Sequence, residues 1–233
     1  SSSSWHLAVG FREDGTAFIG TPRLTITAAF GGSTYEITGG INKVRKLYSS
    51  TDNTGGMVLF TSDFSSTTQN TEAGVDVILT PSTANLGQSV TGFGGYTLTQ
   101  SDEFIVNGRV TCTVDQVLES TGAISIPEGK IVLSLNAKDD ATKLAALKAL
   151  QPGDTIDIDV SSADSRWTEA TQALGAMYKL VTDGQVVQPT SSAEQSAWAE
   201  RAPRTAIGIK ADGTVIFYTM DGRQSGYSVG CTL

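Results

Sequence analysis

The chain has 233 residues, of which 39% are hydrophobic and 17% are charged. That composition is sufficient to bury the core of one large domain or two small ones. The formal charge of -8 excludes nucleic acid as an expected partner, because a phosphate backbone is neutralised by clustered Lys and Arg. We also expect no membrane span, since no stretch approaches the roughly 18 apolar residues that such a helix needs.

The first part of the chain alternates apolar and polar residues between Gly-containing turns, a pattern typical of antiparallel strands. Residues 6–20 predict a hairpin around Asp14-Gly15, and residues 24–37 predict another around Gly31-Gly32. Both dipeptides favour a type I′ turn, whose two central residues need a positive φ. Residues 49–70 are rich in Ser, Thr and Asn, so we expect a polar loop that crosses one short strand.

The middle of the chain predicts buried strands and a helix. Strand-like runs occur at residues 57–61, 75–80, 131–135 and 155–160. Between the last two, Asp139 or Asp140 can cap a helix, a leucine stripe gives it an apolar face, and Pro152-Gly153 ends it.

The last part predicts a second helix at residues 167–174 and a final hairpin. This hairpin runs from Ile207 to Phe217 around Asp212-Gly213, which again suggests a type I′ turn. The predicted fold class is α+β, with strand-dominant mixed or antiparallel sheets and a few short helices.

Histidine and cysteine offer little to catalysis or metal binding. The single histidine, His6, lies at the start of the chain, where an imidazole is poorly held for nucleophilic catalysis. Cys112 and Cys231 are too few for a disulfide framework and lack the spacing of a zinc site. A bridge between them remains an alternative to two free thiols. We expect no metal and no cofactor.

Two arginines flank the final hairpin. Arg204 follows Pro203 at its start, and Arg223 follows the Asp221-Gly222 pair at its end. In a simple hairpin around residues 212–213, positions 204 and 221 fall near the same open end. Two guanidinium groups there could clamp a phosphodiester, because each offers a planar fork of donors. The alternative is that both are solvated charges at strand ends.

Asp221 poses a similar choice between a turn residue and a functional carboxylate. It is followed by Arg223, Gln224 and the small-residue string 225–230. Backbone amides in such a string, on the approach to a helix N-terminus, can receive an anion.

Residues 202–233 resemble the phosphodiester glycosidase family. Three elements occur in the order and spacing of the family: Pro203-Arg204-Thr205-Ala206, Asp221-Gly222-Arg223-Gln224 and Ser228-x-Gly230. Weaker similarity, including an Asn-x-x-Arg block at Asn42 and Arg45 and a Thr-rich loop, extends it to about residues 5–233. Family members begin with an Asn-Gly-x-Phe-Phe segment and continue through a helix to Asn-Leu-Asp-Gly-Gly-Gly-Ser-Thr. We therefore expect residues 1–233 to form a single domain of this family, incomplete at both ends.

The resemblance implies a secreted or cell-surface hydrolase that cleaves a sugar 1-phosphodiester, so a carbohydrate or sugar-phosphate substrate is the expected partner. It implies catalytic roles for Asp221, Arg204 and Arg223, with the second carboxylate in the missing segment, which a second chain could supply. It also implies substrate-binding roles for Asn42, Arg45, Thr68, Thr205, Gln224, Ser228 and Gly230. The alternative is a non-catalytic carbohydrate-binding module of the cell surface or an inactive fragment of the enzyme.

Overall fold

The computed structural model describes residues 7–43, 56–81 and 108–233. The chain divides into two compact units. The central unit spans Arg23–Glu169, and the terminal unit combines the residues up to Pro22 with Ala170–Leu233. The single-domain organisation of residues 1–233 stays a prediction.

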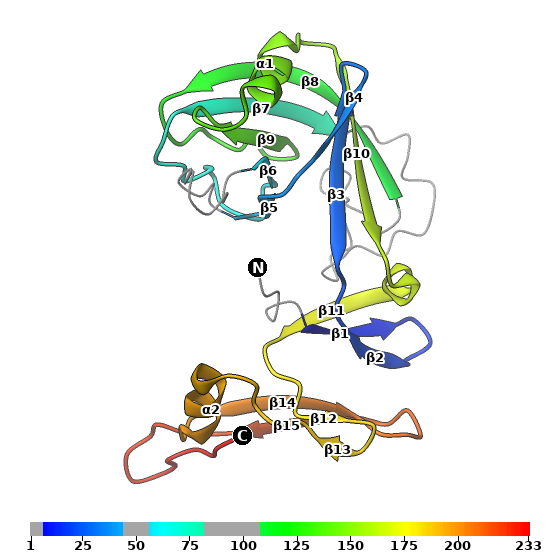
Figure 1. Ribbon diagram of the computed structural model, residues 1–233, viewed down its shortest axis with the longest axis vertical. Coiled ribbons are helices and arrows are strands. Elements are labelled where there is room, and N and C mark those ends of the chain that lie inside the picture. Colours follow the sequence, from blue (N-terminus) through cyan, green and yellow to red (C-terminus); the bar gives the residue numbers. More distant parts are fainter. Residues whose placement is uncertain (1–6, 44–55, 82–107) are drawn as a thin grey trace. The chain divides into compact units, whose positions relative to one another are not determined.

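The central unit is built on an eight-stranded sheet with the order β4-β3-β10-β8-β7-β9-β6-β5 (Figure 1). Its strands are β3 (Leu24–Phe30), β4 (Ser33–Glu36), β5 (Gly40–Ile41), β6 (Val58–Phe60), β7 (Gly74–Pro81), β8 (Gly108–Ser120), β9 (Ile131–Asn136) and β10 (Thr155–Ser162). Neighbouring strands are antiparallel except β5 and β6, which run parallel. The sheet is therefore mixed, and the strand-dominant prediction is confirmed.

The core of the central unit lies on both faces of this sheet, which is why β9 is buried at every position. Helix α1 (Ala141–Ala149) packs on β7, with Leu147 fully buried. The Asp140 side chain caps this helix by accepting hydrogen bonds from the backbone N–H groups of Thr142 and Lys143, as predicted. A separate apolar cluster includes Val58, Phe60, Ile126 and Val132.

The terminal unit consists of small sheets and one helix. A three-stranded sheet has the order β11-β1-β2, and two further hairpins pair β12 with β13 and β14 with β15. The elements are β1 (Leu7–Arg12), β2 (Ala17–Gly20), β11 (Ala170–Ala176), β12 (Val181–Thr182), β13 (Gln185–Val186), α2 (Ser192–Ala199), β14 (Arg204–Ile209) and β15 (Val215–Met220).

The predicted hairpins form, but two of their three turns differ from type I′. Only the glycine has a positive φ in the Asp14-Gly15 and Asp212-Gly213 turns. Each aspartate instead accepts a hydrogen bond from the backbone N–H two residues later, which stabilises an Asx turn. The Gly31-Gly32 pair has positive φ at both positions and fits the predicted type I′ turn.

The predicted helix at residues 167–174 is wrong. Residues Ala170–Ala176 form β11, which pairs antiparallel with β1, so tertiary pairing overrides a local Ala/Leu pattern that mimics a helix. Trp167 lies instead in the short 3-10 helix η2 (Ser165–Thr168), with a side chain only 1% exposed.

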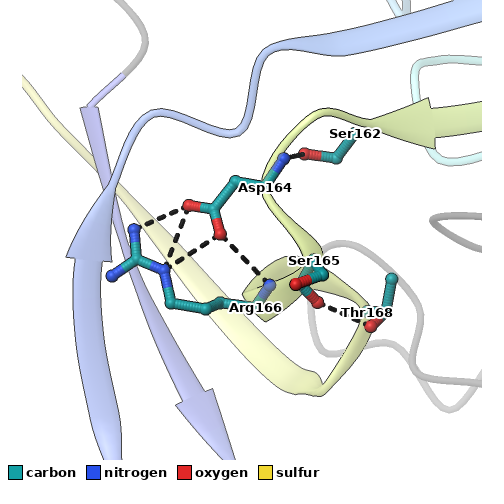
Figure 2. Close-up of polar contacts among 5 residues, drawn as sticks. All are labelled: Ser162, Asp164, Ser165, Arg166 and Thr168. Carbon is teal, nitrogen blue, oxygen red and sulfur yellow. Dashed lines mark hydrogen bonds and ion pairs between the residues drawn. The ribbon is translucent and has the colours of Figure 1, made fainter.

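Figure 2 shows the polar contacts that hold η2 at the end of the central unit. The carboxylate of Asp164 accepts hydrogen bonds from the backbone N–H of Arg166 and from its guanidinium. The Asp164 backbone N–H in turn donates to Ser162 Oγ. The guanidinium of Arg166 holds the pKa of Asp164 below its usual value, so the pair is a local structural clamp.

Candidate functional site

The register of the final hairpin brings its two charged ends together. Arg204, the first residue of β14, lies opposite Met220, the last residue of β15. Asp221 and Arg223 follow Met220 directly, so all three predicted catalytic residues lie at the same open end of the hairpin, as the spacing predicted.

The guanidinium of Arg204 binds backbone carbonyls. Its Nη2 donates to the oxygens of Ala197 at 2.9 Å and Glu200 at 2.7 Å, and its Nε donates to the Cys231 oxygen at 3.5 Å. The last carbonyls of a helix lack partners within the helix and attract a cation. Arg204 therefore ties the end of α2 to the C-terminal segment.

Arg223 approaches the same place from the other strand. Its Nη2 forms an ion pair with Glu200 Oε1, and the two side chains are 62% and 59% exposed. Its backbone φ is 56°, in the left-handed region that residues other than glycine rarely occupy and that recurs at functional sites. Arg204 and Arg223 thus meet at Glu200, one at its carbonyl and the other at its carboxylate.

A third guanidinium, that of Arg201, lies on the same segment. Its Nη1 donates to the Gly230 oxygen at 3.1 Å. Next to it, Ala202 and Cys231 exchange two backbone hydrogen bonds of 3.2 Å. Three guanidinium groups therefore lie around this stretch of backbone. We call Arg201, Arg204 and Arg223 the arginine cluster.

Two glycines let these backbones approach one another. A Cβ atom at Gly222 would lie 2.5 Å from the nitrogen of Pro203, and one at Gly230 would lie 2.4 Å from the oxygen of Ala202. Neither position can hold a side chain without moving backbone. The position of Arg223, directly after Gly222, is therefore set by close packing of main chain.

The Asp221 carboxylate is exposed and has no partner among the described residues. Its backbone oxygen accepts a hydrogen bond from Ser228 Oγ at 2.6 Å. The N–H groups of Gln224 and Ser228 bind each other's carbonyls within a tight turn, so these two amides are occupied rather than open to an anion. Asp221 is thus the free carboxylate beside the arginine cluster.

The remaining predicted substrate-binding residues are divided between the two units. Thr205 and the Gln224 side chain are exposed in the terminal unit. In the central unit, Asn42 forms a pair of 2.8 Å hydrogen bonds with Thr61, and the buried Thr68 Oγ1 accepts from the N–H of Ile124. These contacts give Asn42 and Thr68 structural roles in the loops of that unit. Arg45, like His6, lies outside the described residues.

Metal ligands do not gather in the described ranges, where no group of three or more His, Cys, Asp or Glu side chains could hold an ion. Both cysteines are free thiols, so the bridge considered as an alternative is not formed. Burial raises the pKa of the Cys112 thiol to about 12, with a smaller contribution from the charge of Asp157. The charged groups that the structure brings together at this end of the hairpin are guanidinium and carboxylate groups.

Sequence reasoning missed Glu200 and Arg201. Both directly follow α2, a helix that was not predicted although its start carries the Ser191-x-x-Glu194 sequence of a capping box, in which Ser191 Oγ accepts a hydrogen bond from the Glu194 N–H. Recognising that box would have placed the end of a helix immediately before Pro203. The charged Glu200-Arg201 pair would then have been placed next to Arg204.

Comparison with known proteins finds one matching family and two solved structures of similar fold. A family model described as phosphodiester glycosidase matches residues 100–233. A hypothetical protein from Synechocystis has a TM-score of 0.58 at 16% identity, over 93% of this chain and 34% of that chain. A candidate exported protein from Burkholderia pseudomallei has a TM-score of 0.57 at 17% identity, over 97% of this chain and 47% of that chain.

At such identities the two solved structures establish the fold alone. This chain spans about a third of the first protein and about half of the second. No curated protein matches the chain significantly. Across the described ranges, no helix combines the length and apolar character needed to cross a membrane.

Proposed function

Because the chain belongs to the phosphodiester glycosidase family, we propose that it carries the phosphate-binding part of an extracellular hydrolase that cleaves sugar 1-phosphodiesters. The observation that supports this most strongly is the meeting of Arg204 and Arg223 at Glu200. The Glu200 carboxylate already binds the Arg223 guanidinium there, and phosphate oxygens likewise accept hydrogen bonds from guanidinium groups.

The arginine cluster would bind the phosphate of the substrate. Arg223 offers an exposed guanidinium, and Arg204 keeps its Nη1 without a partner among the described residues after tying down α2. When the bond between the sugar C1 and the phosphate oxygen breaks, negative charge grows on the leaving phosphate monoester. Fixed guanidinium groups stabilise such charge in place, so they would favour the transition state over the substrate.

Asp221 would supply one carboxylate of the reaction. Glycosidic cleavage commonly uses one carboxyl group as an acid and another as a nucleophile or as the base that activates water. A phosphate monoester is a weakly basic leaving group, which reduces the need for a strong acid. Water adds to C1, and the products are the free sugar and the phosphate monoester.

An extracellular location is the second part of the proposal. The low-charge composition, rich in Ser, Thr and Gly, is compatible with it, and one solved protein of the same fold is described as a candidate exported protein. The alternative function is a module that binds cell-surface carbohydrate without cutting it. Retention of Arg204, Asp221 and Arg223 favours the enzyme.

The test is hydrolysis of the methyl diester of N-acetylglucosamine 1-phosphate by the longest native polypeptide that contains this chain. Arg223→Gln should lower kcat/KM by about 100-fold, the effect of removing one donor to developing charge. Arg109→Gln is the matched control, because Arg109 pairs with Asp157 and Asp159 in the central unit, and it should keep normal turnover. Normal turnover by Arg223→Gln would contradict the phosphate site, and diester binding without turnover by the unmodified protein would favour the binding module.

A further inference from the structure

Glu200 is fixed in front of Arg223 by its own backbone. It is the C-cap of α2, and its N–H donates to the Ser196 oxygen at 3.2 Å. Its carbonyl oxygen accepts from Arg204 Nη2 at 2.7 Å. With both backbone groups bound, the backbone of Glu200 is held where the side chain can reach the Arg223 guanidinium.

We propose that Glu200 is a built-in competitor for the anion site on Arg223, so that every anionic ligand of Arg223 must displace it. This inference rests on the proposed function, because it assigns a gate to the same phosphate site. In the free protein the Glu200 carboxylate satisfies Arg223, and a ligand must displace it to bind.

The exposure of the ion pair makes this displacement feasible. Both side chains are more than half exposed, and ion pairs in such positions contribute little because water and salt screen them. A buried pair would be too costly to separate. From the usual strength of exposed pairs, removal of the Glu200 carboxylate should tighten phosphate binding by about two- to fivefold.

The tethered carboxylate sets a common threshold for anions. It acts at an effective concentration in about the millimolar range, and this competition lowers the apparent affinity of every anion that binds Arg223 by the same factor. Phosphate brings more charge and additional oxygens, and Arg201 and Arg204 have donors that no described residue uses. Phosphate should therefore bind more tightly than acetate both with and without the Glu200 carboxylate.

The simpler alternative is that the Glu200–Arg223 pair only fastens the end of α2. In that case Glu200→Gln would lower the stability of the terminal unit and leave phosphate affinity unchanged or weaker. The inference thus predicts that Glu200→Gln binds phosphate more tightly, whereas the alternative predicts unchanged or weaker binding.

The experiment is a titration of the ¹⁵N-labelled chain with inorganic phosphate, and separately with acetate, at low ionic strength, followed through the arginine Nε–Hε signals. The variants are Glu200→Gln, Arg223→Gln and the double variant. Glu13→Gln is the matched control, because Glu13 is an exposed carboxylate of the terminal unit without a described partner and its loss changes the net charge equally.

We expect phosphate to shift the Arg223 signal in the unmodified chain, and Glu200→Gln to bind phosphate two- to fivefold more tightly while Glu13→Gln does not. Glu200→Gln should tighten acetate binding by the same two- to fivefold, and the double variant should match Arg223→Gln. Equal phosphate affinity in the unmodified chain and Glu200→Gln overturns the inference and leaves the proposed function standing. Absence of phosphate binding in both overturns the inference together with the phosphate site.

Discussion

The two units of the molecule are stabilised in different ways. The central unit buries large apolar side chains completely, among them Leu59, Phe60, Leu133, Leu147 and Ile158. The terminal unit buries mainly small residues and leaves Phe217, Tyr227 and Val229 at least 61% exposed. The end of this unit that carries the candidate site depends instead on arginine-to-carbonyl hydrogen bonds and on glycines packed against backbone. The candidate site is therefore specified by main-chain geometry, whereas the central unit is specified by apolar burial.

Truncating one large side chain in each unit should give the largest difference in the free energy of unfolding. Leu133→Ala removes a fully buried side chain of β9 and should lower the free energy of unfolding by about 2–5 kcal/mol. Tyr227→Ala removes a side chain that is 74% exposed and should cost about 0.5 kcal/mol or less. Urea denaturation measures both, and equal costs would contradict the contrast.

The glycine contacts offer the corresponding test in the terminal unit. Gly230→Ala would place a Cβ 2.4 Å from the Ala202 oxygen at a φ of 87°, and should cost about 1–3 kcal/mol. Gly208→Ala is the control, because nothing lies within 4 Å of its Cβ position. Thermal unfolding and limited proteolysis of residues 170–233 would report the loss, and a tolerated Gly230→Ala would show that backbone packing does not hold the site.

The η2 clamp should give a smaller and pH-dependent effect. Asp164→Asn weakens a cap and should cost about 1 kcal/mol at neutral pH. Hydrogen bonding to Arg166 lowers the pKa of Asp164 in the folded state, so its stabilisation is present above the unfolded value of about 3.9 and is lost as pH falls through the folded value. The difference between the unmodified chain and the variant should therefore shrink at acid pH. Asp63→Asn, an exposed change in the same unit, is the control with the same change in charge.

The reactivity of the two thiols should show the same contrast between the units in the unmodified chain. Burial raises the pKa of Cys112 in the central unit to about 12, so its reactive thiolate is scarce at neutral pH. Cys231 in the terminal unit is only partly buried. A thiol reagent should label Cys231 first and Cys112 only after unfolding, as peptide mass mapping would reveal. Rapid labelling of both would mean that the β8 region is open.

Sequence patterns predicted the scaffold better than the terminal unit. Alternating apolar runs located β6, β7, β9 and β10, and Asp140 with Pro152-Gly153 bounded α1, because burial and capping leave local signals. Residues 167–174 were misassigned because the pairing of β11 with β1 depends on a strand more than 150 residues earlier. Such non-local pairing has no local signature.

The same distinction applies to the candidate site. Arg204 and Arg223 could be placed together because hairpin register follows from the position of a turn. Glu200 and Arg201 were missed because the capping signal of α2 was not recognised, and their contacts also depend on how Ala202 packs against Gly230. The left-handed backbone of Arg223 likewise has no signal in the local sequence.

The proposed reaction breaks the bond between the sugar and the phosphate. Hydrolysis of the methyl diester of N-acetylglucosamine 1-phosphate in ¹⁸O-labelled water, by the longest native polypeptide that contains the chain, tests it directly. Attack at the sugar carbon leaves the original oxygens on phosphorus, so mass spectrometry should find methyl phosphate without ¹⁸O. Methyl phosphate, or the sugar phosphate, carrying one ¹⁸O would place the attack at phosphorus and contradict the glycosidase account.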